Sequence, residues 1–333
     1  MSEAWPSAIA RGWHPLALLD ELRSGPVAAT LMGVKLVLFA AKTGPVVLLD
    51  RCPHRAMPLS KGRVADGAIA CPYHGWRFAE GGRCVQVPGT DAVPTAAATA
   101  LPVRVEAGLI WTSLADVPGE FPGLPPEMTD GGLDTFWWAP PASAARLLDA
   151  IENHLDPAHP HYLHPWIVRS PAKRREVRVR VRLGPHGGEA IYEEDSRASG
   201  LMPRLMEGRR LRSIGRYFAP TIGQVAFEGV KGMTLAISVI FSPEDIDRTR
   251  PFAHFATPKG WLPRWFKRLA LIGFHVPVLR QDRAALATQA GNIARFGGAD
   301  FAIGPLDFLG PTIWRLANGK VQEVEEREEI VWL

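Results

Sequence analysis

Two short stretches of the chain, Cys52-Pro53-His54-Arg55 and Cys71-Pro72-Tyr73-His74-Gly75-Trp76, decide how its N-terminal part is expected to fold. Each stretch offers one cysteine thiolate and one histidine imidazole, and sixteen residues separate His54 from Cys71. Two thiolates and two imidazoles can hold a [2Fe-2S] cluster, with the cysteines on one iron and the histidines on the other. Two cysteines and two histidines can also form a structural zinc site. The two stretches therefore predict a metal centre.

The arrangement of these ligands favours iron over zinc. Each loop pairs one cysteine with one histidine, whereas a zinc finger groups its cysteines on a hairpin and its histidines on a helix. A proline follows each cysteine and Gly75-Trp76 follows the last histidine, a pattern typical of rigid turns. We therefore expect an iron–sulfur cluster held by Cys52, His54, Cys71 and His74.

Residues 46–89 resemble the Rieske domain of the Rieske non-haem iron oxygenases, above all in the two motifs at 52–55 and 71–76. A second Rieske class, from respiratory chains, carries an extra cysteine in each loop, and these two cysteines form a disulfide. In this chain the corresponding residues are Met57 and Tyr73, so the resemblance is to the oxygenase class. It implies a Rieske [2Fe-2S] cluster carried by an all-β domain.

Length and cysteine content suit a two-domain intracellular enzyme. A chain of 333 residues can form two substantial cores. Two of the three cysteines are assigned to the cluster and Cys84 is expected to be a plain buried thiol, which excludes a disulfide scaffold. Residues 1–22 lack the apolar core of a signal peptide, and no run of eighteen apolar residues occurs. We expect a cytoplasmic protein.

Much of the net charge of +4 lies in residues 173–183, where arginines alternate with Val177, Val179, Val181 and Leu183. This alternation predicts a half-buried strand with a solvated basic face. A second interpretation is a surface that attracts an acidic electron-donor protein. We expect no nucleic-acid binding, because the sequence shows neither bases interleaved with aromatic residues nor a known binding module.

The order of short β-rich segments predicts where the first domain ends. Residues 33–39 and 45–49 are apolar, β-rich and bounded by glycine or proline, which is typical of a small all-β module. Residues 115–132 are too rich in proline and glycine for a helix or a central strand. We therefore predict a Rieske domain at 1–118 and a catalytic domain at 119–333.

The second domain opens with a predicted helix over 143–156, which Pro157 and Pro160 end or redirect. Histidines gather at this break, and a mononuclear Fe(II) site needs two histidines and one carboxylate. His159 and His164 can meet if the prolines break the helix, and the chemistry alone leaves His154 and His161 as candidates. The ordinary alternative is a surface turn with structural histidines.

The family resemblance implies a choice among these residues. Its catalytic domain has an aspartate, a histidine three residues later and a second histidine five residues after that, often with an asparagine before them. The matching residues are Asn153, Asp156, His159 and His164. By resemblance the histidines bind iron, and Asp156 links one of them to a Rieske histidine of the neighbouring subunit. The third ligand is assigned to Asp282, in preference to Asp300, Asp307 and Glu244.

The resemblance also implies the architecture of the second domain. The family folds an antiparallel sheet around a long helix, a helix-grip arrangement, and residues 232–241 fit one of its strands. The whole chain is therefore expected to be α+β. Residues 261–274 combine aromatic, basic and apolar residues. We expect them to form a core or subunit-interface helix, with a membrane-surface helix as the alternative.

The function implied by the resemblance is that of a terminal oxygenase. Electrons would come from an NAD(P)H-dependent reductase, through a ferredoxin in some systems, to the Rieske cluster and then to Fe(II). There O2 would be used to hydroxylate or oxidatively demethylate an aromatic or polycyclic substrate, within a homotrimer. The alternatives are a ring cis-dihydroxylating dioxygenase, a Rieske-type electron carrier and a zinc-stabilised binding module.

Overall fold

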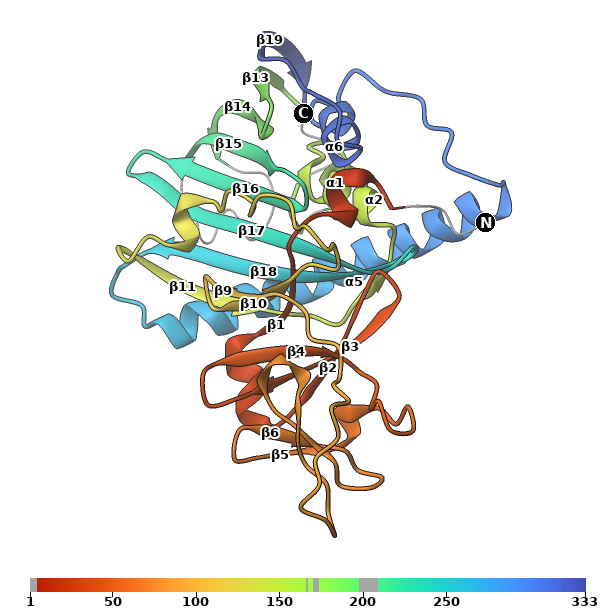
Figure 1. The fold of residues 1–333 in the computed structure, drawn as a ribbon. Coiled ribbons are helices and arrows are strands. Elements are labelled where there is room, and N and C mark those ends of the chain that lie inside the picture. Colours follow the sequence, from red (N-terminus) through yellow and green to blue (C-terminus); the bar gives the residue numbers. More distant parts are fainter. Residues whose placement is uncertain (1–4, 166, 170–173, 198–208) are drawn as a thin grey trace. The chain divides into compact units, whose positions relative to one another are not determined.

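The computed structural model describes residues 5–165, 167–169, 174–197 and 209–333, and they form two compact units (Figure 1). One unit consists of Ala10–Phe121 together with Ser242–Ile246. The other consists of Pro122–Phe241 and Asp247–Leu333, with the N-terminal residues up to Ile9. The division into domains at 1–118 and 119–333 stays a proposal about which parts fold independently.

The unit that holds the cluster motifs is made of short antiparallel strands. Three small sheets have the orders β1-β10-β9, β2-β3-β4 and β5-β6-β7-β8. The strands are β1 (His14–Leu18), β2 (Val27–Leu31), β3 (Val34–Ala40), β4 (Pro45–Leu49), β5 (Arg63–Ala65), β6 (Ala68–Ala70), β7 (Arg77–Phe78), β8 (Cys84–Gln86), β9 (Val103–Glu106) and β10 (Leu109–Thr112). Short 3-10 turns at Leu19–Ser24, Leu59–Lys61 and Glu80–Gly82 connect them. The expected strands at 33–39 and 45–49 are confirmed as β3 and β4.

Strand β3 supplies both cores of this unit, because successive side chains of a strand point to opposite faces. Val37 and Phe39 pack into the core that includes the cluster cysteines, whereas Leu36 and Leu38 pack into a second core. Cys84 is 3% exposed and lies in the first of these cores as a free thiol, as expected. Full burial of a side chain such as Phe39 contributes about 2 to 3 kcal/mol to the free energy of folding. The core beneath the cluster loops is therefore stable.

The other unit is one antiparallel sheet with helices along it. The strand order is β11-β18-β17-β16-β15-β14-β13-β19, with β12 beside β18. The strands are β11 (Leu133–Trp138), β12 (Ser143–Ala144), β13 (Glu176–Gly184), β14 (Gly187–Arg197), β15 (Arg209–Phe218), β16 (Ile222–Gly229), β17 (Gly232–Asp245), β18 (Arg248–Pro258) and β19 (Glu325–Trp332). The helices are α1 (Ser7–Ala10), α2 (Leu147–Leu155), α3 (His159–Tyr162), α5 (Arg264–Arg295) and α6 (Gly310–Ala317), with a 3-10 turn at Pro126–Met128.

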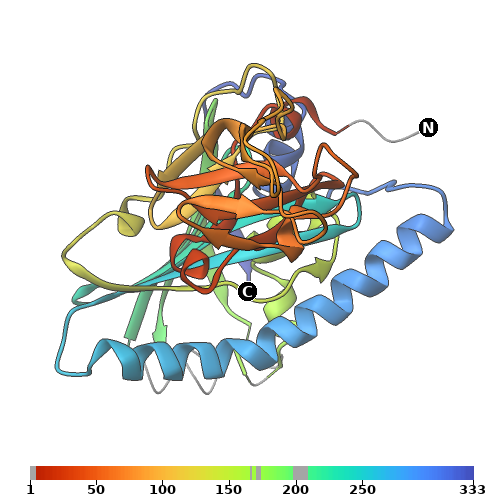
Figure 2. The same ribbon diagram turned by 60° about the horizontal axis from the view of Figure 1, so that its bottom comes forward.

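The long helix α5 runs along one face of this sheet, as both views show (Figures 1 and 2). Its His275 ring packs against Phe255 of β18 with the ring centroids 5.0 Å apart. The expected α+β fold, with an antiparallel sheet around a long helix, is therefore confirmed.

The helix expected over 143–156 is shorter at its start. Residues 143 and 144 pair with Thr249 and Arg248 of β18 as strand β12, and the Thr249 hydroxyl donates to the Ala145 carbonyl at 2.9 Å. The helix begins only at Leu147 and ends at Leu155. The expectation of a start at Ser143 was wrong, because sheet pairing of the backbone outweighs the helix propensity of the alanines.

The arginine-rich strand β13 has the predicted alternation, with Val177, Val179, Val181 and Leu183 buried. Glutamates of the neighbouring strands face its arginines. The ion pairs are Arg178 with Glu328 at 3.2 Å, Arg182 with Glu326 at 3.1 Å and Arg180 with Glu193 at 3.8 Å. The basic face is therefore part of a mixed-charge ladder, which agrees with the solvated-strand interpretation rather than with a docking surface for an acidic protein.

The aromatic segment at 261–274 does not pack as a core helix. Trp261, Trp265 and Leu269 are 90%, 67% and 67% exposed, and Leu271 is buried. The expectation of core packing is therefore wrong for Trp261, Trp265 and Leu269, whereas Leu271 and Phe274 line a cavity of this unit. The interpretation as a subunit-interface helix stays a prediction. Among the described residues, no helix is long and apolar enough to cross a membrane.

Candidate metal centres

The two cluster loops share one backbone design. In each loop the cysteine amide donates to the carbonyl oxygen five residues later, and the amide four residues later donates back to the cysteine carbonyl. The four bonds are Cys52 N to Met57 O (2.9 Å), Ala56 N to Cys52 O (2.8 Å), Cys71 N to Trp76 O (2.8 Å) and Gly75 N to Cys71 O (3.0 Å). The donors Ala56 and Gly75 both have left-handed backbones, with φ of 56° and 72°. A Cβ on Gly75 would lie 2.8 Å from Pro88 Cγ, so this turn favours glycine.

The loops bring the four predicted cluster ligands together. Cys52 and Cys71 are buried and their thiols interact, and burial, with the neighbouring Cys71 adding to it, raises the pKa of Cys52. The rings of His54 and His74 lie 4.6 Å apart, and His54 stacks on Trp76. Among the described residues, His54 Nδ1 is buried and has no hydrogen-bond partner. A buried imidazole nitrogen without a partner fits a metal ligand, so the donor set suits the cluster.

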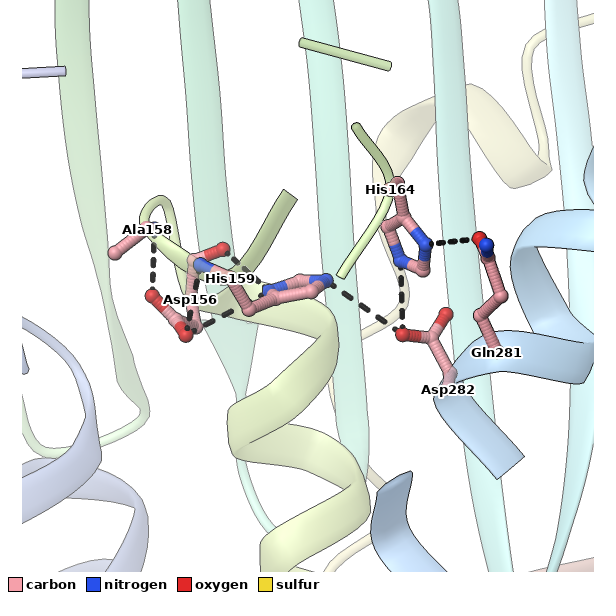
Figure 3. Close-up of polar contacts among 6 residues, drawn as sticks. All are labelled: Asp156, Ala158, His159, His164, Gln281 and Asp282. Carbon is pink, nitrogen blue, oxygen red and sulfur yellow. Dashed lines mark hydrogen bonds and ion pairs between the residues drawn. The ribbon is translucent and has the colours of Figure 1, made fainter. Parts of the chain in front are cut away.

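A second ligand set lies at the break between α2 and α3. The helix α2 ends before Asp156, and the chain then turns so that the rings of His159 and His164 lie 5.3 Å apart. The Nε2 atoms of His159 and His164 lie 3.7 and 3.0 Å from Asp282 Oδ1. One ligand atom from each of the three residues lies within 4.8 Å of the others (Figure 3). Two imidazoles and a carboxylate on one side of a metal are the donor set of non-haem Fe(II) sites.

Oxygen acceptors fix both imidazoles in the orientation that a metal needs. Nδ1 of His159 donates to the Asp156 carbonyl at 3.1 Å, and Nδ1 of His164 donates to Gln281 Oε1 at 2.8 Å. Because these acceptors hold the protons on Nδ1, both Nε2 lone pairs face Asp282. The sequence gives no local sign of the contact between Gln281 and His164, because 117 positions separate the two residues.

The Asp156 carboxylate shapes the break and lies beside a ligand ring. It accepts hydrogen bonds from the amides of Ala158 at 2.7 Å and His159 at 3.2 Å. Its Oδ2 lies 3.6 Å from His159 Nδ1. Burial alone would raise the pKa of Asp156, but the His159 ring and these two amides outweigh burial and lower it. The residue thus combines the geometry of a cap with contact to a candidate iron ligand.

Asn153 supports the third ligand. Its side chain hydrogen-bonds Asp282 and helps to lower the pKa of that carboxyl, although burial opposes this and His164 contributes more. Asn153 therefore lies in the triad's surroundings, where the pattern of the resemblance places it.

The other sequence candidates lie outside the triad. His154 is buried beside it, and burial lowers its pKa to about 4, whereas His161 is 2% exposed and belongs to no ligand group among the described residues. Asp307 accepts the Gly304 amide in a turn, and Glu244 belongs to the unit of the cluster loops. Of the carboxylates considered, Asp282 is the one that meets the two histidines.

A cavity of about 310 Å³ opens beside the triad, between the sheet and the helices α2 and α5. All three triad residues line it, and so do Val225, Phe227, Ile237, Val239 and Phe255. Its size is at the lower end of small-molecule pockets and its wall is mostly apolar. Three of its hydroxyl groups are already engaged. Thr249, Thr234 and Ser213 donate to Ala145 O, Phe227 O and Glu194 Oε1 at 2.9, 3.0 and 2.8 Å.

Three histidines of this unit should make the fold acid-labile. Burial lowers the pKa of His154, His254 and His275 to about 4 from the usual 6.5. As the pH falls below 6.5 the unfolded chain binds protons that the folded chain does not, so stability decreases until about pH 4. We expect the free energy of unfolding to fall by up to about 4 kcal/mol per pH unit between about pH 6 and pH 5, because three protons are involved.

Urea unfolding across this pH range measures the slope, and His254→Leu should reduce it by about one third because one of three protons is removed. A slope in His254→Leu equal to that of the parent protein would contradict the assignment.

Comparison with known proteins defines the first centre. Residues 12–97 match the family described as the Rieske [2Fe-2S] domain, a range that includes both cluster loops. These residues therefore form a Rieske domain, and the cofactor of that domain is a [2Fe-2S] cluster.

The relatives are oxygenase components. That of chloroacetanilide N-alkylformylase from Rhizorhabdus wittichii (strain DC-6 / KACC 16600) is 37% identical over 176 residues, 50% of this chain and 49% of that protein. That of 3-ketosteroid-9-alpha-monooxygenase from Rhodococcus rhodochrous is 33% identical over 170 residues, 48% of this chain and 44% of that protein. The chain thus spans about half the length of these relatives.

The fold has close counterparts among solved structures. Dicamba monooxygenase bound to dicamba superposes with a TM-score of 0.79 at 21% identity, over 93% of this chain and 97% of that one. NdmA of Pseudomonas putida CBB5 with caffeine gives a TM-score of 0.78 at 21% identity, over 93% and 90%. At 21% identity, these two structures show that the chain shares their fold.

Proposed function

We propose that the chain is a terminal oxygenase that receives electrons at its Rieske cluster and uses O2 at a mononuclear Fe(II) to hydroxylate or oxidatively demethylate a small organic substrate. The observation that carries this proposal is the convergence of His159, His164 and Asp282 on one side of an apolar cavity. A pure electron carrier or a zinc-stabilised module has no use for such a cavity beside a second ligand set.

The residues around the triad support this role in three ways. Asp156 and Gln281 hold the protons of the two imidazoles on Nδ1, so both rings keep a fixed orientation. The apolar wall excludes water and favours an aromatic or polycyclic substrate. Two histidines and one carboxylate leave coordination positions open, and a bound Fe(II) would supply the site at which O2 is activated.

The relatives support an oxygenase that acts on compact, largely apolar molecules, because two of them are named for reactions of a chloroacetanilide and a 3-ketosteroid. A ring cis-dihydroxylating dioxygenase is the second candidate, favoured by a relative named 3-chlorobenzoate-3,4-dioxygenase oxygenase subunit, from Comamonas testosteroni. The partners we propose are an NAD(P)H-dependent reductase, with a ferredoxin where needed, and two further copies of the chain in a homotrimer.

Oxygen consumption tests the function. The purified protein should contain iron and acid-labile sulfide and show the red-brown spectrum of a Rieske cluster. With NADH and a surrogate reductase, a panel of aromatic acids, methyl ethers and sterol-like compounds should include at least one that couples NADH oxidation to O2 uptake and an oxygenated product. A protein with the cluster that forms no product from any of these would favour the electron carrier.

A further inference from the structure

His275 lies on the same face of α5 as the ligand Asp282, seven residues before it. Seven residues make about two helical turns and about 10 Å along the axis. Pro277 lies between them, the helix is bent along its length (Figure 2), and both side chains line the cavity. The helix therefore carries a metal ligand at one point of the cavity wall and an imidazole about one aromatic ring system away.

The orientation of the His275 ring is fixed. Its Nδ1 lies 2.7 Å from the Leu271 carbonyl oxygen, and because a carbonyl only accepts, Nδ1 holds the proton. The rings of Phe255 and Phe274 pack edge-on against it, each with its centroid 5.0 Å away. Nε2 is then a hydrogen-bond acceptor, and it has no partner among the described residues. Burial keeps the imidazole neutral, since its pKa is about 4.

An unpaired acceptor on a residue that lines a ligand cavity selects ligands by their donors. The hydroxyls of Thr249, Thr234 and Ser213 already donate to protein oxygens, so they do not compete for this nitrogen. Filling the cavity with a molecule that has no donor would leave Nε2 desolvated and unpaired, which is unfavourable. A hydroxyl or N–H group in the right place would satisfy it.

We propose that Nε2 of His275 accepts a hydrogen bond from a hydroxyl or N–H group of the substrate, about two helical turns of α5 from the iron ligand Asp282. The inference rests on the proposed function, because it assumes that the cavity is the substrate site. It narrows the substrates to compact aromatic or alicyclic molecules that bear such a donor. His275 is then a positioning residue that sets which carbon faces the metal site.

Binding of a matched pair of ligands tests this role without turnover. 2-Naphthol and 2-methylnaphthalene differ by a hydroxyl in place of a methyl group of similar size. Calorimetric titration of the iron-loaded protein gives a dissociation constant for each ligand. In the ratio of the two constants, the contribution from burying the ring system cancels, because both ligands have the same rings. In His275→Phe the preference for 2-naphthol should fall by about fivefold to tenfold, the range of one net hydrogen bond. In His275→Gln, whose amide oxygen reaches a similar position, it should stay within about twofold of the parent value.

The matched control is His254→Phe. His254 is also a buried neutral imidazole, and it lies next to Phe255 on β18 but does not line the cavity. This variant should keep the parent ratio within about twofold, whereas a general loss of packing would move both variants alike. An unchanged ratio in His275→Phe would overturn the proposal, and so would a failure of 2-naphthol to bind the iron-loaded parent protein. Because no step of the test needs O2 or a reductase, its outcome is separate from that of the oxygenase assay.

Discussion

Replacing His164 with alanine should abolish turnover and remove the mononuclear iron, while the spectrum of the cluster survives. The side chain of His164 is 1% exposed, and its Nε2 lies 3.0 Å from Asp282 Oδ1. After the substitution, a group from the exposed surface could not easily take its place as a metal ligand. The four cluster ligands belong to the other compact unit. We expect the iron content to fall by about one ion per chain with sulfide unchanged, and product formation to fall at least about a hundredfold.

Two control variants sharpen this test. His161→Gln changes another buried histidine of the same segment that belongs to no ligand group, so it should keep the mononuclear iron. Cys71→Ser should do the reverse of His164→Ala, losing sulfide and colour while the mononuclear site keeps its metal. Loss of the cluster spectrum in His164→Ala would contradict the separation of the two centres.

Asp156→Asn should retain both metals and the fold but lower product formation at least about a hundredfold. The amide keeps one oxygen that can accept the Ala158 amide, and the main-chain carbonyl that orients His159 is unchanged. Asparagine also caps helices about as well as aspartate, so stability should change by only a few tenths of a kcal/mol. What disappears is the negative charge 3.6 Å from His159 Nδ1, and with it the acceptor that a link from Asp156 to a Rieske histidine of a neighbouring copy would need.

Single-turnover reduction separates the two roles of Asp156. A prereduced variant should hold its electron on the cluster, and the cluster band should bleach normally when reductant is added. If a fully metallated Asp156→Asn protein formed product at nearly the parent rate, the residue would be a cap and no more.

Mixing two inactive variants tests whether electrons cross between chains. Co-expressed Cys71→Ser and His164→Ala chains each lack one centre, so activity can return only if the cluster of one chain serves the iron of another. Recovery of a substantial fraction of parent activity would support the proposed homotrimer, because its ring interface would pair centres of different chains. No recovery from a mixed oligomer of confirmed composition would argue for transfer within one chain.

Local motifs made the cluster loops predictable, whereas distant contacts did not show in the sequence. The residue types and the spacing of four ligands on two short loops predict a metal centre. The strands beside them are predicted by the alternation of residues and by glycine or proline boundaries. The link from His164 to Asp282 spans 118 positions, so it came only from the family resemblance. The roles of Gln281 and His275 depend on which face of a long helix meets a cavity, and no local pattern reports that.

The errors have physical causes as well. Residues 143 and 144 looked helical because alanine favours helices, but hydrogen bonds to β18 hold them in a strand. Trp261 and Trp265 were expected to be buried because large apolar side chains usually are, yet both are exposed in the single chain. Propensity and hydrophobicity are averages, and the tertiary context decided both cases.

The bent helix α5 also fixes the distance between two side chains of the candidate site. Its backbone, rather than the packing of its few buried residues, fixes the spacing between the acceptor at His275 and the ligand at Asp282. A single residue inserted between them would rotate the imidazole by about 100° around the axis and turn it away from the cavity. Insertions of about three or four residues would keep both on one face and lengthen the gap by one turn, about 5 Å. The reach of this site toward longer substrates can therefore change only in steps of a helical turn.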